Sequence, residues 1–130
     1  MEKASRSPFV QDKFRVGVMI ALAAVSMLLP RAALAHAKLV QSSPAINSTT
    51  QGPDVAVAMK FSSRVDGARS TMLLSSPDGQ SSPVTIEHQS APDTLTTHLT
   101  HLKPGKYAIQ WTVLAIDGHV TRGEIPFSVK

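Results

Sequence analysis

The sequence has no cysteine and few aromatic residues, and each shortage excludes a kind of function. Without cysteine the chain can form no disulfide, no thiolate metal site and no cysteine nucleophile. Only 5% of its residues are aromatic, too few for a face that stacks against polysaccharide. It also has no Gly-x-Ser-x-Gly stretch and no identifiable pair of carboxylates, so nothing indicates a hydrolase. We therefore assign no catalytic residues and do not expect an enzyme.

The first 35 residues have the parts of a secretory signal. A positively charged opening is followed by VGVMIALAAVSMLL, an apolar run of about 14 residues. That run is shorter than the roughly 20 residues needed to cross a bilayer, which favours a signal over an uncleaved membrane anchor. Ala33-Leu34-Ala35 fits the small-x-small pattern of a cleavage site. We therefore predict a signal peptide at residues 1–35, cleavage after Ala35, and one mature domain at residues 36–130.

Loss of the signal changes the charge of the protein. The mature segment carries 8 Lys and Arg against 7 Asp and Glu, so its net charge is +1, compared with +4 for the whole chain. A nucleic-acid-binding surface needs a basic patch, and none survives processing. All five histidines remain. We therefore expect no nucleic-acid partner, and a small domain held together by its apolar core alone.

Alternating apolar and polar residues predict β-strands along the mature segment. The alternation is strictest at residues 55–61, 107–115 and 125–129. Turn-forming pairs such as Ser-Pro, Pro-Asp, Pro-Gly and Asp-Gly separate the apolar segments, and no stretch has a helical period. About seven short strands of this kind predict a two-sheet antiparallel sandwich or a small barrel. The shorter strands are expected at residues 38–41, 71–75, 84–87 and 95–99.

The residue after the predicted cleavage site is His36. Cleavage would place its imidazole beside a free α-amine, and these two groups can bind one metal ion in a six-membered chelate ring. Asp117-Gly118-His119 lies between the two most regular strands, and Gly118 favours a tight hairpin because glycine accepts a positive φ. Asp117 and His119 can then converge at the rim of the sandwich. The alternative is an ordinary turn, with Asp117 capping its own backbone and His119 facing solvent.

Together these residues would offer a metal ion three nitrogens and one oxygen. Nitrogen and oxygen ligands suit Cu(II), and the absence of thiolate and thioether ligands argues against Cu(I). Zn(II) accepts the same ligands in a tetrahedral arrangement, so ligand type alone leaves zinc open. The set also requires the N-terminal strand to run beside the hairpin.

Motifs at both ends of the mature segment match those of a known family. They are His36-Ala37-x-Leu39-x-x-Ser42-x-Pro44, Leu102-x-Pro104-Gly105-x-Tyr107, Trp111-x-Val113, Asp117-Gly118-His119, Gly123, Phe127 and Val129. In these motifs the segment resembles the CopC family of periplasmic copper-binding proteins. The resemblance implies an immunoglobulin-like antiparallel β-sandwich of Greek-key topology. It also implies one Cu(II) ion held by His36, Asp117 and His119.

The resemblance further implies a role in copper homeostasis or resistance. Family members carry or buffer copper in the periplasm and exchange it with an inner-membrane protein of the CopD type. Some also hold Cu(I) in a Met-rich loop, but Met59 and Met72 stand alone here, so we expect no Cu(I) site. We expect a monomer whose ligand is a copper ion.

Three other histidines and the tryptophan have simpler interpretations. His98 and His101 are three residues apart and would point to opposite faces of a strand, so we expect both in solvent. His88 stands at the end of a predicted strand without a visible partner. Trp111 is central in the most regular strand, and we expect it in the core.

Two other functions could use the same residues. An N-terminal histidine and a second histidine also form the copper brace of lytic polysaccharide monooxygenases, so a copper oxidase or monooxygenase is the main alternative. Asp117 argues against it, because a carboxylate favours Cu(II) and fills a position that oxygen would need. The third possibility is a structural module in which His36 is accidental. It is distinguished by whether His36, Asp117 and His119 converge.

Overall fold

The computed structural model describes residues 36–130, and the predicted signal peptide lies outside the described residues. No helix in the described range is long and apolar enough to cross a membrane. This part of the chain forms eight strands, which are β1 (Leu39–Ser43), β2 (Ser48–Thr50), β3 (Val55–Phe61), β4 (Val65–Ser75), β5 (Ser81–Val84), β6 (Thr94–Leu99), β7 (Gly105–Ala115) and β8 (Val120–Val129).

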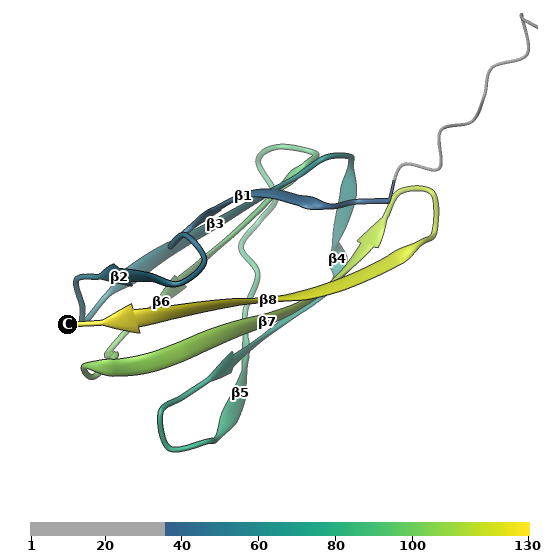
Figure 1. Ribbon diagram of the computed structural model, residues 1–130. Helices are drawn as coiled ribbons and strands as arrows, with labels where there is room; N and C mark the ends of the chain where they lie inside the picture. Colours follow the sequence, from purple (N-terminus) through teal and green to yellow (C-terminus); the bar gives the residue numbers. More distant parts are fainter. Residues whose placement is uncertain (1–35) are drawn as a thin grey trace, which may run out of the picture. The chain divides into compact units, whose positions relative to one another are not determined.

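The strands form two sheets that pack as an immunoglobulin-like β-sandwich (Figure 1). The order is β1-β3-β6 in the three-stranded sheet and β2-β8-β7-β4-β5 in the other. Neighbouring strands pair antiparallel, except that β2 runs parallel to β8. Because β3 and β4 belong to different sheets, the short corner between them, residues 62–64, crosses from one layer to the other.

The predicted strands with strict alternation are confirmed. The inward residues of β3, β7 and β8 are buried and their neighbours are more exposed, as the period of two requires. β2 was not predicted, because Ser48–Thr50 has no apolar alternation. β4 starts at Val65 rather than Thr71, and its first half is irregular because the register with β7 shifts between Asp66 and Thr71.

A strand was predicted at residues 84–87, but the corresponding strand, β5, occupies Ser81–Val84. After Val84 the chain leaves the five-stranded sheet and runs along β6. There the N–H of Glu87 donates to the carbonyl of Thr96 at 2.9 Å. The Thr97 hydroxyl donates to the carbonyl of Thr85 at 2.6 Å. These scattered bonds cover the edge of β6 without continuing a regular ladder.

The core lies between the sheets and contains Trp111, as predicted. Trp111 is 6% exposed, and its ring meets the Phe61 ring edge-on at a centroid distance of 5.4 Å. Gly123 stands opposite Trp111 across β7 and β8, and a Cβ atom there would lie 2.3 Å from Cζ2 of the indole ring. Gly123 therefore provides the room that the indole needs. Met59 and Met72 are also buried core residues.

Candidate metal site

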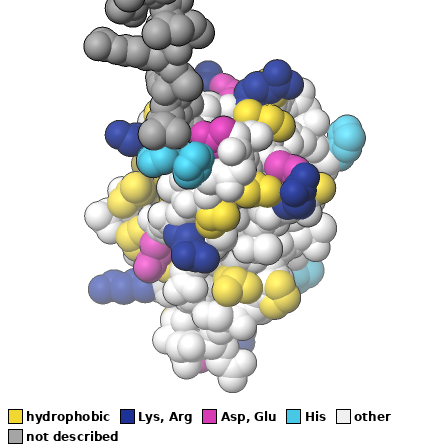
Figure 2. Space-filling model, turned by 90° about the vertical axis from the view of Figure 1, so that its right-hand side faces the viewer, with side chains coloured by type: hydrophobic (Ala, Val, Ile, Leu, Met, Phe, Trp, Pro, Cys, Tyr) yellow, Lys and Arg dark blue, Asp and Glu magenta, His cyan; other side chains and the backbone are white. Residues whose placement is uncertain are grey.

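The segment before β1 and the β7–β8 hairpin meet at one end of the sandwich. The imidazole rings of His36 and His119 have centroids 5.0 Å apart and are inclined at 45°. Figure 2 shows two histidine side chains side by side on this face, with an acidic side chain next to them. The required proximity of the N-terminal strand and the hairpin is therefore present.

Gly118 shapes the hairpin that carries His119. Its φ is +89°, and its N–H donates to the carbonyl of Ala115 at 2.9 Å. The N–H of Ala115 donates in turn to the carbonyl of His119 at 2.8 Å. A turn followed by a residue with positive φ is a common three-residue hairpin loop. The Asp-Gly pair thus forms the tight turn that the sequence predicted.

Asp117 contacts His119 at two points. Its Oδ1 accepts the backbone N–H of His119 at 3.0 Å, and its Oδ2 lies 3.1 Å from Nδ1 of the imidazole. The backbone hydrogen bond from His119 is the largest cause that lowers the pKa of Asp117 below its ordinary value, and the charges of His119 and His36 add to it. Capping of the backbone by Asp117 was expected only if this stretch were an ordinary turn. Here Asp117 caps the backbone of His119 and also contacts its imidazole.

The main chain around His36 is held by Ser62, in the β3–β4 corner. The Ser62 hydroxyl donates to the carbonyl of His36 at 3.1 Å and accepts the N–H of Lys38 at 3.0 Å. The N–H of Ser62 donates to the carbonyl of Lys38 at 2.8 Å. Ala37, which lies between His36 and Lys38, is fully buried. Ser62 could not be recognised from neighbouring residues, because its partners are 24 and 26 residues away.

The structure brings together part of the predicted ligand set. His36 lies beside His119, and Asp117 contacts His119. Across residues 36–130, no three His, Asp or Glu side chains are already placed to hold one metal ion. In the full chain the nitrogen of His36 is part of the peptide bond to Ala35, so its amine exists only after cleavage.

The remaining histidines lie elsewhere on the surface. His98 is exposed, as predicted, but its Nδ1 is in hydrogen-bond contact with Glu87 Oε1. Thr96 donates to the other oxygen of Glu87 at 2.9 Å. His101 is also exposed and has a φ of +59°, with its N–H donating to Asp54 Oδ1 at 3.2 Å. The pairing of Glu87 with His98 depends on the chain crossing to β6 and could not be predicted from their spacing.

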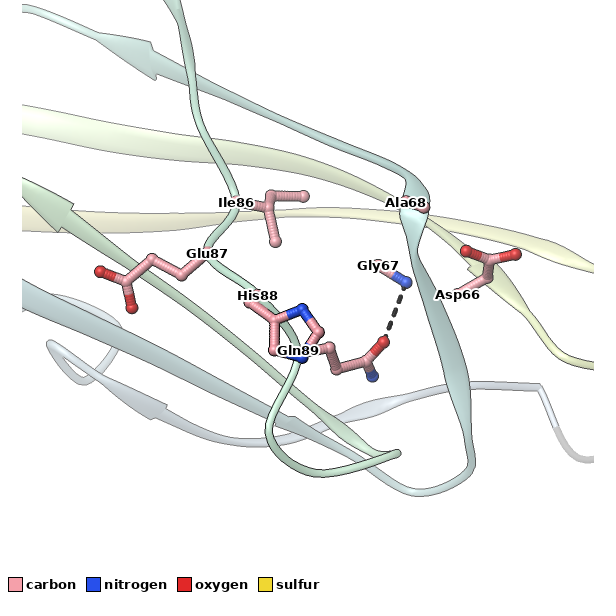
Figure 3. A pocket seen from close by; sticks show the side chains of 7 residues that line it. All are labelled: Asp66, Gly67, Ala68, Ile86, Glu87, His88 and Gln89. Atoms are coloured by element: carbon pink, nitrogen blue, oxygen red, sulfur yellow. Dashed lines mark hydrogen bonds between the residues drawn. The ribbon is translucent and has the colours of Figure 1, made fainter.

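His88 lines a surface hollow of about 370 Å³ beside β4 (Figure 3). In this hollow Gln89 reaches β4, where its Oε1 accepts the N–H of Gly67 at 3.1 Å. Its Nε2 donates to the carbonyl of Val65 at the same distance. Asp66, on the other wall, is paired with Arg69. The polar groups here mostly stabilise the irregular half of β4, which makes the hollow a poorer metal site than the imidazole pair.

Comparison with known sequences agrees with the family resemblance of the sequence motifs. The CopC domain family matches residues 39–130. Copper resistance protein C of Xanthomonas campestris pv. juglandis is 32% identical over 111 residues, which cover 79% of this chain and 87% of that protein. Protein YobA of Escherichia coli strain K12 is 30% identical over 114 residues, which cover 85% of this chain and 91% of that protein.

Solved structures agree with the sequence comparison. CopC from Methylosinus trichosporium OB3b superposes with a TM-score of 0.67 at 28% identity, covering 73% of this chain and 94% of that one. PcoC, a methionine-rich copper resistance protein from Escherichia coli, superposes with a TM-score of 0.61 at 23% identity, covering 74% of this chain and 100% of that one. The second likeness concerns the fold alone.

Proposed function

Because the chain belongs to the CopC family of copper resistance proteins, we propose that it carries or buffers Cu(II) in the periplasm. In this proposal the chain is exported, cut after Ala35, and binds one Cu(II) ion. The ligands are His36, through its α-amine and Nδ1, together with Asp117 and His119. An inner-membrane protein of the CopD type would exchange copper with it.

The observation that carries the proposal is the 5.0 Å separation of the His36 and His119 rings. Two imidazoles and a carboxylate at one end of a rigid sandwich suit Cu(II) in ligand type. This arrangement also argues against a structural module in which His36 has no role, because His36 lies next to His119. The N-terminal amine would supply the donor that the described side chains lack.

Each residue has a distinct part in holding copper. The Asp117 carboxylate is ionised at neutral pH, as any ordinary aspartate is, and its negative charge favours a dication nearby. Its contact with Nδ1 of His119 orients the ring, and as a ligand the carboxylate would exchange this contact for the metal. His36 adds the chelate at the chain end. The donors are hard or borderline, so the site would favour Cu(II) over Cu(I) and hold copper rather than cycle it.

The decisive experiment is a Cu(II) titration followed by EPR on two proteins. One starts at His36, and the other carries a single extra residue before it. The extra residue turns the His36 α-amine into a peptide nitrogen and so removes the six-membered chelate, which should weaken binding by orders of magnitude and change the spectrum. If the two proteins bind copper alike, the amine is not a ligand and the proposed site is wrong.

A second measurement tests the carrier role against the oxidase alternative. The copper-loaded protein is incubated with ascorbate and oxygen, and peroxide formation is compared with that of the metal-free protein. A carrier should form no peroxide above this control. Sustained turnover of ascorbate by the loaded protein would favour the copper brace of a monooxygenase. Titration with Zn(II) under the same conditions measures whether zinc competes for the site.

A further inference from the structure

We infer that Ser62 is a positioning residue, which holds the mature N-terminus where its nitrogens can bind metal. The inference rests on the proposed function and names a residue that takes no part in the ligand set. Ser62 follows β3 directly and lies in the β3–β4 corner, residues 62–64. Its side chain is exposed, so it is not needed to fill the core.

Ser62 makes three hydrogen bonds to the segment that leads into β1. Its hydroxyl donates to the carbonyl of His36 at 3.1 Å and accepts from the N–H of Lys38 at 3.0 Å. Its backbone N–H donates to the carbonyl of Lys38 at 2.8 Å. One side chain thus satisfies a backbone acceptor and a backbone donor on either side of Ala37, whose methyl group is fully buried.

These contacts act on residues that would otherwise be mobile. The first residues of a domain are poorly ordered unless they are tied down. Fixing each residue costs backbone entropy, which an untethered chain end would have to lose when the metal binds. The hydrogen bonds of Ser62 and the burial of Ala37 would offset this loss of entropy during folding, before copper binds. The His36 amine and ring are then already oriented.

The same corner also contacts the other half of the site. The carbonyl of Arg64 accepts the N–H of Ile116 at 3.1 Å, and Ile116 directly precedes Asp117. Phe61, at the other end of the corner, is buried against the Trp111 ring. Residues 62–64 therefore hold the N-terminal segment and the hairpin from one anchored piece of chain. This arrangement sets the distance between His36 and His119.

The test compares Cu(II) affinity and EPR spectra of proteins that start at His36. Ser62→Ala removes the hydroxyl and should weaken binding about 10- to 100-fold, the usual effect of losing a residue that orients a ligand. Ser62→Thr keeps the hydroxyl and should restore most of the affinity. Ser75→Ala is the matched control, because it removes a hydroxyl that bonds to Ser81 at 2.9 Å at the far end of β4. It should bind copper like the unchanged protein.

A second comparison separates positioning from general stability. In the protein with one extra residue before His36, the His36 nitrogen is in a peptide bond and only the His36 ring is left to position, so Ser62→Ala should cause a clearly smaller further loss of copper affinity. An equal loss with and without the extra residue would overturn the inference, as would a Ser62→Ala protein that binds normally. If the extra residue itself changes nothing, the proposed function fails instead.

Amide hydrogen exchange gives a test without any substitution. The N–H of Lys38 should be protected in the metal-free protein that starts at His36, although Lys38 is its third residue. Exchange at the rate of an unstructured peptide would show that the segment is not held, and would overturn the inference whatever the variants do.

Discussion

The carboxylate of Asp117 holds both the backbone and the ring of His119. One oxygen accepts the backbone N–H at 3.0 Å, and the other lies 3.1 Å from Nδ1. The turn and the imidazole are therefore oriented by the same side chain. A substitution at this position can separate the two contacts, because asparagine keeps an oxygen for the backbone and loses the charge.

Asp117→Asn should weaken Cu(II) binding by about 10-fold or more while the hairpin stays folded. The amide oxygen still caps the N–H of His119, but it offers the dication no negative charge. Asp117→Ala should weaken binding and also lower the stability of the hairpin, because the cap is lost. Isothermal titration measures the affinity, and chemical shifts of residues 115–120 report the turn. Unchanged affinity in Asp117→Asn would mean that the carboxylate does not contribute to the metal site.

Copper affinity should fall steeply as the pH drops from about 7 to about 5. An ordinary α-amine takes up a proton near pH 8 and an ordinary imidazole near about 6.5, and both must be deprotonated to bind metal. Competition titrations at several pH values measure the slope. The protein with one extra N-terminal residue is the control and should show a shallower slope, because its His36 nitrogen is in a peptide bond and the α-amine is no longer part of the proposed chelate. An affinity independent of pH over this range would contradict the amine and imidazole ligands.

Glu87 should titrate below 4.5, the ordinary value for a glutamate. Its hydrogen bond with His98 is the largest cause of the lowered pKa, and the hydrogen bond from Thr96 adds to it. A lowered folded-state pKa means that the interaction stabilises the protein above the ordinary pKa. That contribution is lost as the pH falls through the folded-state value. NMR titration of the Glu87 carboxyl carbon measures the midpoint.

The His98→Ala variant provides the control for Glu87. Removal of the imidazole should raise the midpoint towards 4.5, and Thr96→Val should raise it less. Because Thr96 and His98 lie outside the proposed metal site, neither His98→Ala nor Thr96→Val should change copper affinity. A midpoint that does not move in His98→Ala would show that the contact with Glu87 is absent in solution.

Gly123→Ala should lower the free energy of unfolding by about 1–3 kcal/mol. The new methyl group would lie 2.3 Å from Cζ2 and 2.7 Å from Cε2 of the Trp111 ring, which is buried and cannot move freely. Urea unfolding measures the loss. In a Trp111→Phe background the outer part of the indole, with Cζ2, is gone, so Gly123→Ala should cost clearly less. An equal cost in both backgrounds would mean that the indole does not require the glycine.

The sequence alone determined the local features of this protein. Alternation fixed which faces of β3, β7 and β8 are buried, because neighbouring side chains on a strand always point to opposite sides. Gly118 determined the tight turn, because a positive φ suits a residue without a side chain. The position of His36 after a cleavage pattern, and the donor types of His36, Asp117 and His119, were also readable from residue order. Each of these depends on a few adjacent residues.

Only the tertiary structure decided which distant residues meet. The approach of His36 to His119 depends on the packing of two sheets and on the corner that links them. Ser62, with its bonds to His36 and Lys38, and Glu87, with its bond to His98, had no local signal. The polar strand β2 and the irregular start of β4 were missed for the same reason. Strand order and register are set by packing across the whole domain, and no short stretch of sequence contains that information.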